Sequence, residues 1–128
     1  MLKSIVTDFN DFAARTGFYL YFLIFLAVFI LFFAVTPVVG GGINSGLGAH
    51  VCGYSVLSFS ALLLFRTKDI NRIFLKAALF AGGYGLLIET IQLLVPFRLF
   101  EISDIIINFS ASVVGIVPGY FLVKHKWI

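Results

Sequence analysis

GFYLYFLIFLAVFILFFAVTPVV, residues 17–39, is the stretch that decides the fold of this 128-residue chain. It contains no charged residue, and its phenylalanines would lie on every face of a helix. A helix needs about 20 predominantly apolar residues to cross the hydrocarbon core of a bilayer, so this stretch is long enough to span a membrane. It is also longer than the apolar core of a signal peptide, and no small-x-small cleavage site follows it, so we expect a retained transmembrane helix.

Three further apolar runs follow the first one. With the first run at about 17–39, they occupy about residues 47–65, 73–95 and 102–123. Pro96 ends the third run, because a proline lacks the backbone N–H that would continue the helical hydrogen bonds. Apolar residues make up 61% of the chain and charged residues 12%, a balance far from that of soluble domains. The sequence therefore predicts an all-α membrane protein with one domain over residues 1–128, built as a four-helix transmembrane bundle.

The segment before the first run has a different pattern. Residues 2–16 place Ile5, Phe9 and Phe12 on one helical face, and charged residues largely on the other: Lys3, Asp8, Asp11 and Arg15. Such amphipathic segments lie in the interface of a membrane. We expect a short interfacial helix at the N-terminus, separate from the first span.

Basic residues predict the orientation. The stretch between the second and third runs carries four of the nine Lys and Arg residues, Arg66, Lys68, Arg72 and Lys76, whereas each end of the chain carries two and the other two connections carry none and one. Cytoplasmic loops of membrane proteins are enriched in Lys and Arg, so this connection and both termini are expected in the cytoplasm. Because the basic residues do not form a stripe, the net charge of +3 does not indicate binding to nucleic acid. A re-entrant second segment, in place of a full span, is the alternative topology.

Two stripes of small and polar residues follow the third and fourth runs at intervals of three or four. One consists of Gly82, Gly85, Glu89, Gln92 and Pro96, and the other of Asp104, Asn108, Ala111, Gly115 and Gly119. Residues at these intervals share one helical face. Small residues let helices approach closely in lipid, so we expect the two stripes to face each other. Their polar ends would then meet at the outer side of the bundle.

The polar residues expected at that end are the predicted ligand-binding residues: His50, Tyr54, Glu89, Gln92, Arg98, Asp104 and Asn108. A charged side chain near the bilayer centre costs about 2.5 to 3.5 kcal/mol, so Glu89 is expected to be paired, protonated or in contact with water. Its available partners are Arg98, Gln92 and His50. The alternative is that these groups form an ion-pair and hydrogen-bond network that only holds the helices in register.

The same residues include candidates for catalysis and for metal binding. Glu89 and Asp104 are candidates for an acid and a base, because two carboxylates in different environments differ in pKa. Ser55 and Ser103 are close by, but no neighbouring motif marks either as an activated nucleophile. His50, Glu89 and Asp104 are metal-ligand types, yet the chain has no HxxxH, HExxH or CxxC spacing. We expect binding rather than catalysis, and we expect no metal and no cofactor.

The combination His50-x-x-x-Tyr54, Glu89-x-x-Gln92, then Arg98 and Ser103-Asp104-x-x-x-Asn108 resembles the VanZ-like family. The resemblance covers about residues 46–120. Two departures stand out. The Asp-Lys pair that precedes the histidine in the family would fall on Gly46 and Leu47, and Ser110 or Ala111 replaces a glycine commonly found after the asparagine.

The resemblance implies a bacterial cell-envelope protein of the inner membrane, because the founding member is linked to teicoplanin resistance and relatives have surface-polysaccharide functions. Our leading hypothesis is an outward-facing polar pocket that binds the head group of an amphiphile: an envelope lipid, a lipid-linked glycan or a lipoglycopeptide. Arg98 would bind phosphate or carboxylate. One alternative is a small enzyme acting on a lipid-linked substrate through Glu89 and Asp104, and another is a structural subunit of a larger envelope or polysaccharide complex.

Overall fold

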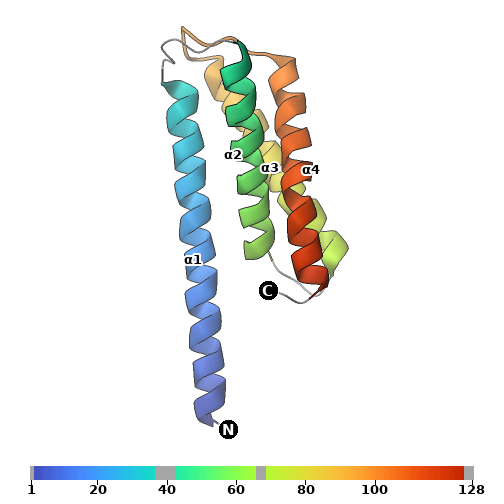
Figure 1. Cartoon of the computed structure of the whole chain (residues 1–128). Helices are drawn as coiled ribbons and strands as arrows, with labels where there is room; N and C mark the ends of the chain where they lie inside the picture. The colour runs from blue at the N-terminus through green and yellow to red at the C-terminus, as the bar shows by residue number, and fades with distance from the viewer. Residues whose placement is uncertain (1, 37–42, 66–68, 126–128) are drawn as a thin grey trace.

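The computed structural model describes residues 2–36, 43–65 and 69–125, and within these ranges it contains four α-helices and no strand. The helices are α1 (Leu2–Val35), α2 (Ile43–Leu64), α3 (Ile70–Gln92) and α4 (Ile102–Lys124). They run alternately up and down, and the N- and C-termini lie toward the same end (Figure 1).

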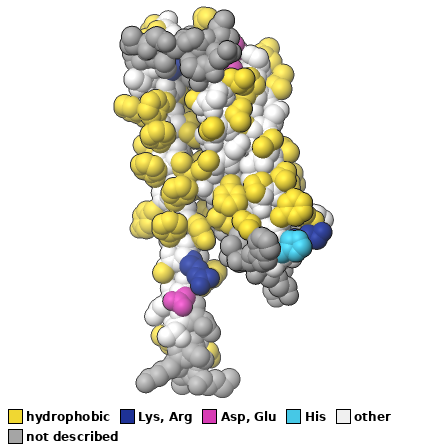
Figure 2. Space-filling model, in the orientation of Figure 1, with side chains coloured by type: hydrophobic (Ala, Val, Ile, Leu, Met, Phe, Trp, Pro, Cys, Tyr) yellow, Lys and Arg dark blue, Asp and Glu magenta, His cyan; other side chains and the backbone are white. Residues whose placement is uncertain are grey.

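Each helix is long and apolar enough to cross a membrane. The mean hydropathy reaches 2.8 in α1 and is between 1.4 and 1.8 in the other three. Apolar side chains cover the sides of the bundle in the view of Figure 2. The prediction of four transmembrane helices is confirmed. The second segment is an unbroken helix of 22 residues, so the re-entrant alternative is wrong.

The prediction of a separate interfacial helix at the N-terminus is also wrong, because α1 continues from Leu2 to Val35. No helix-breaking residue separates the amphipathic part from the span. Gly17 is the weakest position there, and a single interior glycine costs only about 1 kcal/mol relative to alanine. Thr16 bonds through its hydroxyl to the Phe12 carbonyl (2.9 Å) within the helix. The N-terminal part of α1 extends past the ends of the other helices (Figure 1).

The third helix ends earlier than the sequence predicted, at Gln92 rather than Val95. Turn hydrogen bonds replace the helical pattern, from Leu94 N to the Ile91 carbonyl and from Val95 N to the Gln92 carbonyl (both 3.0 Å). The ring of Pro96 disfavours helical backbone at the preceding residue. Glu89 therefore lies about three residues, or roughly 4.5 Å along the axis, before the end of its helix.

Helices α2, α3 and α4 enclose the core. Its fully buried side chains include Leu57, Ala61, Leu62, Ala77, Ala81 and Ile116. Where the backbones come closest, glycines face larger neighbours. A Cβ on Gly82 would overlap the Phe109 ring, and one on Gly115 would overlap the backbone carbonyl of Ser55.

The two small-residue stripes do not face each other along their whole length, which corrects the prediction. Gly82 and Gly85 on α3 face Phe109 and Asn108 of α4, whereas Gly115 and Gly119 on α4 face α2. The physical reason is that a glycine admits a bulky side chain or a backbone from its neighbour. Two facing glycine stripes would leave that space empty.

Candidate functional site

The alternating directions of the helices bring three helix ends together. The N-terminal part of α2 carries His50 and Tyr54, the C-terminal turn of α3 carries Glu89, and the N-terminal part of α4 carries Asp104 and Asn108. All three ends lie at the end of the bundle opposite the termini (Figure 1). This placement follows from an antiparallel chain path with short connections.

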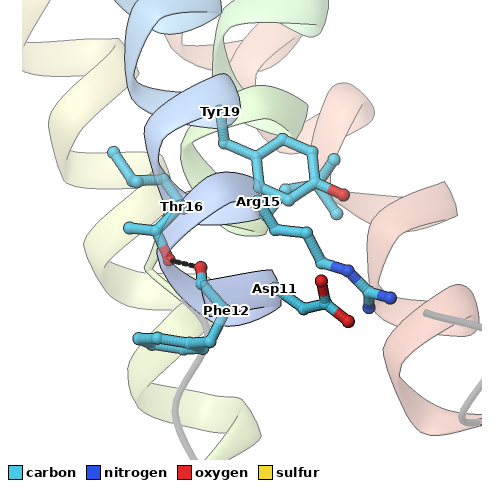
Figure 3. Close-up of a pocket in the computed structure, with 7 residues that line it drawn as sticks. Asp11, Phe12, Arg15, Thr16 and Tyr19 are labelled. Atoms are coloured by element: carbon cyan, nitrogen blue, oxygen red, sulfur yellow. Dashed lines mark hydrogen bonds between the residues drawn. The ribbon is translucent and has the colours of Figure 1, made fainter. Parts of the chain in front are cut away.

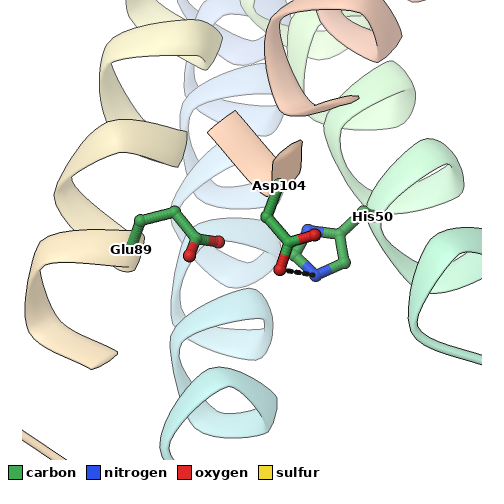
Figure 4. A group of neighbouring side chains, drawn as sticks. All are labelled: His50, Glu89 and Asp104. Carbon is green, nitrogen blue, oxygen red and sulfur yellow. Dashed lines mark ion pairs between the residues drawn. The ribbon is translucent and has the colours of Figure 1, made fainter. Parts of the chain in front are cut away.

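The closest group in this region consists of His50, Glu89 and Asp104. One nitrogen or carboxylate oxygen from each residue lies within 4.8 Å of the others. Figure 4 shows the Glu89 carboxylate extending from α3 toward Asp104, with the His50 ring on the other side of Asp104. The His50 Nε2 to Asp104 Oδ2 distance is 3.9 Å. Glu89 is fully buried, while the side chains of His50 and Asp104 are 21% and 26% exposed, so the group reaches the surface.

Asn108 sets the orientation of the His50 ring. The Nδ1 of His50 lies 2.7 Å from the Asn108 side-chain oxygen. An amide oxygen can only accept a hydrogen bond, so Nδ1 carries the proton and donates. In the neutral ring, Nε2 is then an acceptor beside Asp104. Gly85 provides the space for this contact, because a Cβ there would lie 2.9 Å from the Asn108 Cβ.

Several polar atoms of the site are buried without a hydrogen bond to any described residue. They are both carboxylate oxygens of Glu89, the Asn108 Nδ2 and the Tyr54 hydroxyl. The Tyr54 ring is stacked beside His50, with 6.1 Å between centroids. A buried polar group without a partner typically costs about 1 to 3 kcal/mol, and more when it is charged. Ionisable groups of this kind inside a membrane protein mark functional sites by default.

Arg98 and Gln92, which were predicted to join this group, lie elsewhere. Arg98 donates from one terminal nitrogen to the carbonyls of Phe33 (2.8 Å) and Thr36 (2.9 Å). Gln92 donates to the carbonyl of Ala34 (3.1 Å). The pairing of Arg98 with Glu89 is therefore wrong. The last carbonyls of a helix lack donors within that helix, and a cation is favourable at its negative end, so these two side chains cap α1.

The two serines near the site are engaged in other contacts. The Ser55 hydroxyl donates to the Ala111 carbonyl of α4 (2.9 Å), and the Ser103 hydroxyl donates to Glu101 (3.2 Å). Neither donates to His50, so the geometry does not favour a serine nucleophile. The hydrogen bond between His50 and Asn108 could not be predicted from the sequence, because the two residues are 58 positions apart.

Two hollows lie at the opposite end of the bundle. The larger, of about 490 Å³, is shown in Figure 3 and lies between α1 and the end of α2. It is lined by Asp11, Phe12, Arg15, Thr16, Tyr19, Leu63 and Leu64. The other is lined by Asn71, Phe74 and Tyr120. The site around His50 is a compact, partly exposed group of side chains, and a ligand would contact it from the surface.

Comparison with known families agrees with the resemblance seen in the sequence. A family profile described as VanZ/LLP1 matches residues 49–123, a range that includes His50, Glu89 and Asp104. No curated protein and no solved structure matches the chain. The match covers more than half of the chain, and the four apolar helices agree with a multi-pass membrane protein. The chain belongs to the VanZ/LLP1 family.

Proposed function

We propose that this protein binds the polar head group of an amphiphile at the surface formed by His50, Asp104 and Glu89. The observation that carries the proposal is the Glu89 carboxylate, which is fully buried and has no hydrogen bond to a described residue. It lies beneath two partly exposed polar side chains from other helices. A group that fixed only the helix packing would be expected to pair its carboxylate.

The orientation expected from the basic residues supports a role at the outer face of the bacterial inner membrane. The three helix ends that form the site lie opposite the end of the bundle where α2 ends and α3 begins, and four of the nine Lys and Arg residues fall within residues 66–76 there. Head groups of membrane lipids and of lipid-linked glycans lie at this depth. An amphiphile in the outer leaflet would reach the site without leaving the bilayer.

The chemistry of the surface narrows the kind of head group. Asp104, Glu89 and the Nε2 of His50 are all acceptors in the neutral-ring state, and Arg98 is engaged with α1. A bare phosphate would be repelled by the carboxylates. The head group must therefore contact the site through hydroxyl or amine donors, or through a cation that the two carboxylates share.

Native mass spectrometry of the protein released gently from membranes tests the proposal. The informative variant is Asp104→Asn, because this side chain is partly exposed and its loss of charge leaves the core intact. Glu101→Gln is the matched control, since Glu101 is an exposed carboxylate one turn away. We expect an amphiphile on the wild type and the control, and at least about tenfold less on Asp104→Asn. Equal amounts on all three proteins, or none on any, would reject the proposal.

An acid–base reaction on the bound head group is the second candidate, and one observation favours it. Glu89 is fully buried whereas Asp104 is about one quarter exposed, and carboxylates in such different environments can divide the roles of acid and base. The test is to incubate proteoliposomes with extracted envelope lipids and to analyse the products by mass spectrometry. Products that form equally with Glu89→Gln would exclude this mechanism.

A further inference from the structure

The side chains of His50, Glu89 and Asp104 combine one imidazole nitrogen and two carboxylates from three helices (Figure 4). We propose that they bind a divalent metal ion, and that Zn²⁺ is the ion that fits best. Zinc is commonly held by three protein ligands of these types, with a fourth position left for water or substrate. The sequence did not predict this site, because the three residues lie on separate helices and form no short motif.

The spacing of the ligand atoms suits such a site. Ligand atoms around a tetrahedral zinc ion, at about 2.0 to 2.2 Å from the metal, lie roughly 3.3 Å apart. The His50 Nε2 and the Asp104 Oδ2 are 3.9 Å apart, and one imidazole nitrogen and one oxygen of each carboxylate lie within 4.8 Å of one another. Side-chain rotations that move these atoms by roughly 1 Å would therefore complete the coordination.

The contact between His50 and Asn108 prepares the imidazole to act as a ligand. Metal-binding histidines almost always donate the other ring N–H to an oxygen, which fixes the tautomer and the ring orientation. Here Nδ1 donates to the Asn108 oxygen at 2.7 Å, and Asn108 is itself fully buried. The lone pair on Nε2 is therefore free on the side of the ring that faces Asp104.

The charges independently support a cation. Glu89 is fully buried, extends into the group and has neither a hydrogen bond nor an ion pair with a described residue. Arg98, which the sequence suggested as a partner of Glu89, instead donates to carbonyls of α1. A divalent ion would neutralise both carboxylates at once, which would offset the cost of burying them in a medium of low dielectric constant.

The ligand set also discriminates between metals. Ca²⁺ takes six to eight oxygen ligands, and Mg²⁺ requires near-octahedral oxygen coordination, usually with several waters. One imidazole with two carboxylates suits Zn²⁺ better than either. Where the proposed function holds, a head-group oxygen would occupy the open position on the metal. That last step rests on the proposed function, whereas the metal site does not.

The experiment measures binding of Zn²⁺ alone to the full chain, purified in detergent on a tag without histidine and first treated with a chelator. After zinc is added back and the excess is removed, we expect elemental analysis to find about one zinc per chain. In calorimetry, the affinity for Zn²⁺ should be at least about 100-fold higher than the affinity for Mg²⁺ or Ca²⁺. Asp104→Asn and His50→Gln should each lower the affinity by more than about tenfold, and Asn108→Ala by about 10- to 100-fold. The control Glu101→Gln should bind as the wild type does.

Absence of zinc binding by the wild type, or equal binding by Asp104→Asn, His50→Gln and the control, would overturn the proposal. Circular dichroism of each variant shows whether it has folded. If one of Asp104→Asn and His50→Gln fails to fold, the other still tests the proposal. Co²⁺ in place of zinc should give the visible absorption of a tetrahedral site, and Asp104→Asn should lose it. An amphiphile that binds equally before and after chelation, with no zinc, would reject the metal site alone. Zinc binding without any amphiphile would reject only the proposed function.

Discussion

Gly115→Ala is expected to destabilise the bundle, because α4 lies directly against the backbone of α2 at this position. The new Cβ would be 2.6 Å from the carbonyl carbon of Ser55, so the two helices would have to separate by about 1 Å to reach normal contact. Overpacking of this kind costs about 1 to 3 kcal/mol. Weakening the bond from Ser55 to the Ala111 carbonyl adds about 1 kcal/mol, and the helix preference of alanine returns about 1 kcal/mol. The net loss is about 1 to 3 kcal/mol.

Thermal unfolding of the purified protein in detergent measures this loss. Gly83→Ala is the matched control, because a Cβ at Gly83 meets nothing within 4 Å. The control should be as stable as the wild type or gain up to about 1 kcal/mol. Gly115→Ala should also weaken zinc binding, since separating α2 from α4 moves His50 away from Asp104. If the two alanine variants unfold at the same temperature, close contact at Gly115 does not hold the bundle together, and the reasoning fails.

Three further predictions address other parts of the molecule. Arg98→Ala removes two hydrogen bonds to the end of α1, so it should lower the free energy of unfolding by about 1 to 3 kcal/mol. Proteolysis within α1, followed by mass spectrometry, should become faster. Glu89→Gln should raise the unfolding temperature of the chelator-treated protein, because it removes a buried carboxyl group that has no hydrogen-bond partner, and should abolish stabilisation by added Zn²⁺. A lower unfolding temperature both with and without zinc would contradict this. In a Cys52→Ser background, a membrane-impermeant maleimide added to intact cells should label Leu99→Cys but not His125→Cys, and the reverse would invert the predicted orientation.

The sequence could predict much of the fold because lipid solvation depends on local composition. An uncharged run such as residues 17–39 is soluble only in a bilayer, whatever surrounds it. The resemblance to the VanZ family was also available from short motifs, and the profile match over residues 49–123 confirms it. The predicted ends of the helices were less accurate. Gly17 did not end a helix, whereas Pro96 ended one several residues upstream of itself.

The proximity of His50, Glu89 and Asp104 could be inferred in outline from helical intervals and alternating chain direction, and the structure confirms that the three side chains meet. Whether they bind a ligand stays a prediction. The prediction from helical intervals that Arg98 and Gln92 join this group was wrong. Both lie near the same helix ends, but they donate to the last carbonyls of α1.

By itself, the sequence determined that the chain has four membrane-spanning helices and that its intramembrane polar residues gather toward one end. Only the tertiary structure decided which neighbour each glycine face meets, which partner Arg98 takes and how Asn108 holds the His50 ring. The physical reason is that periodicity specifies the face of a helix on which a residue lies. The residue that a side chain contacts on another helix depends on the rotation and spacing of the neighbouring helices. Both are set by the packing of the whole bundle.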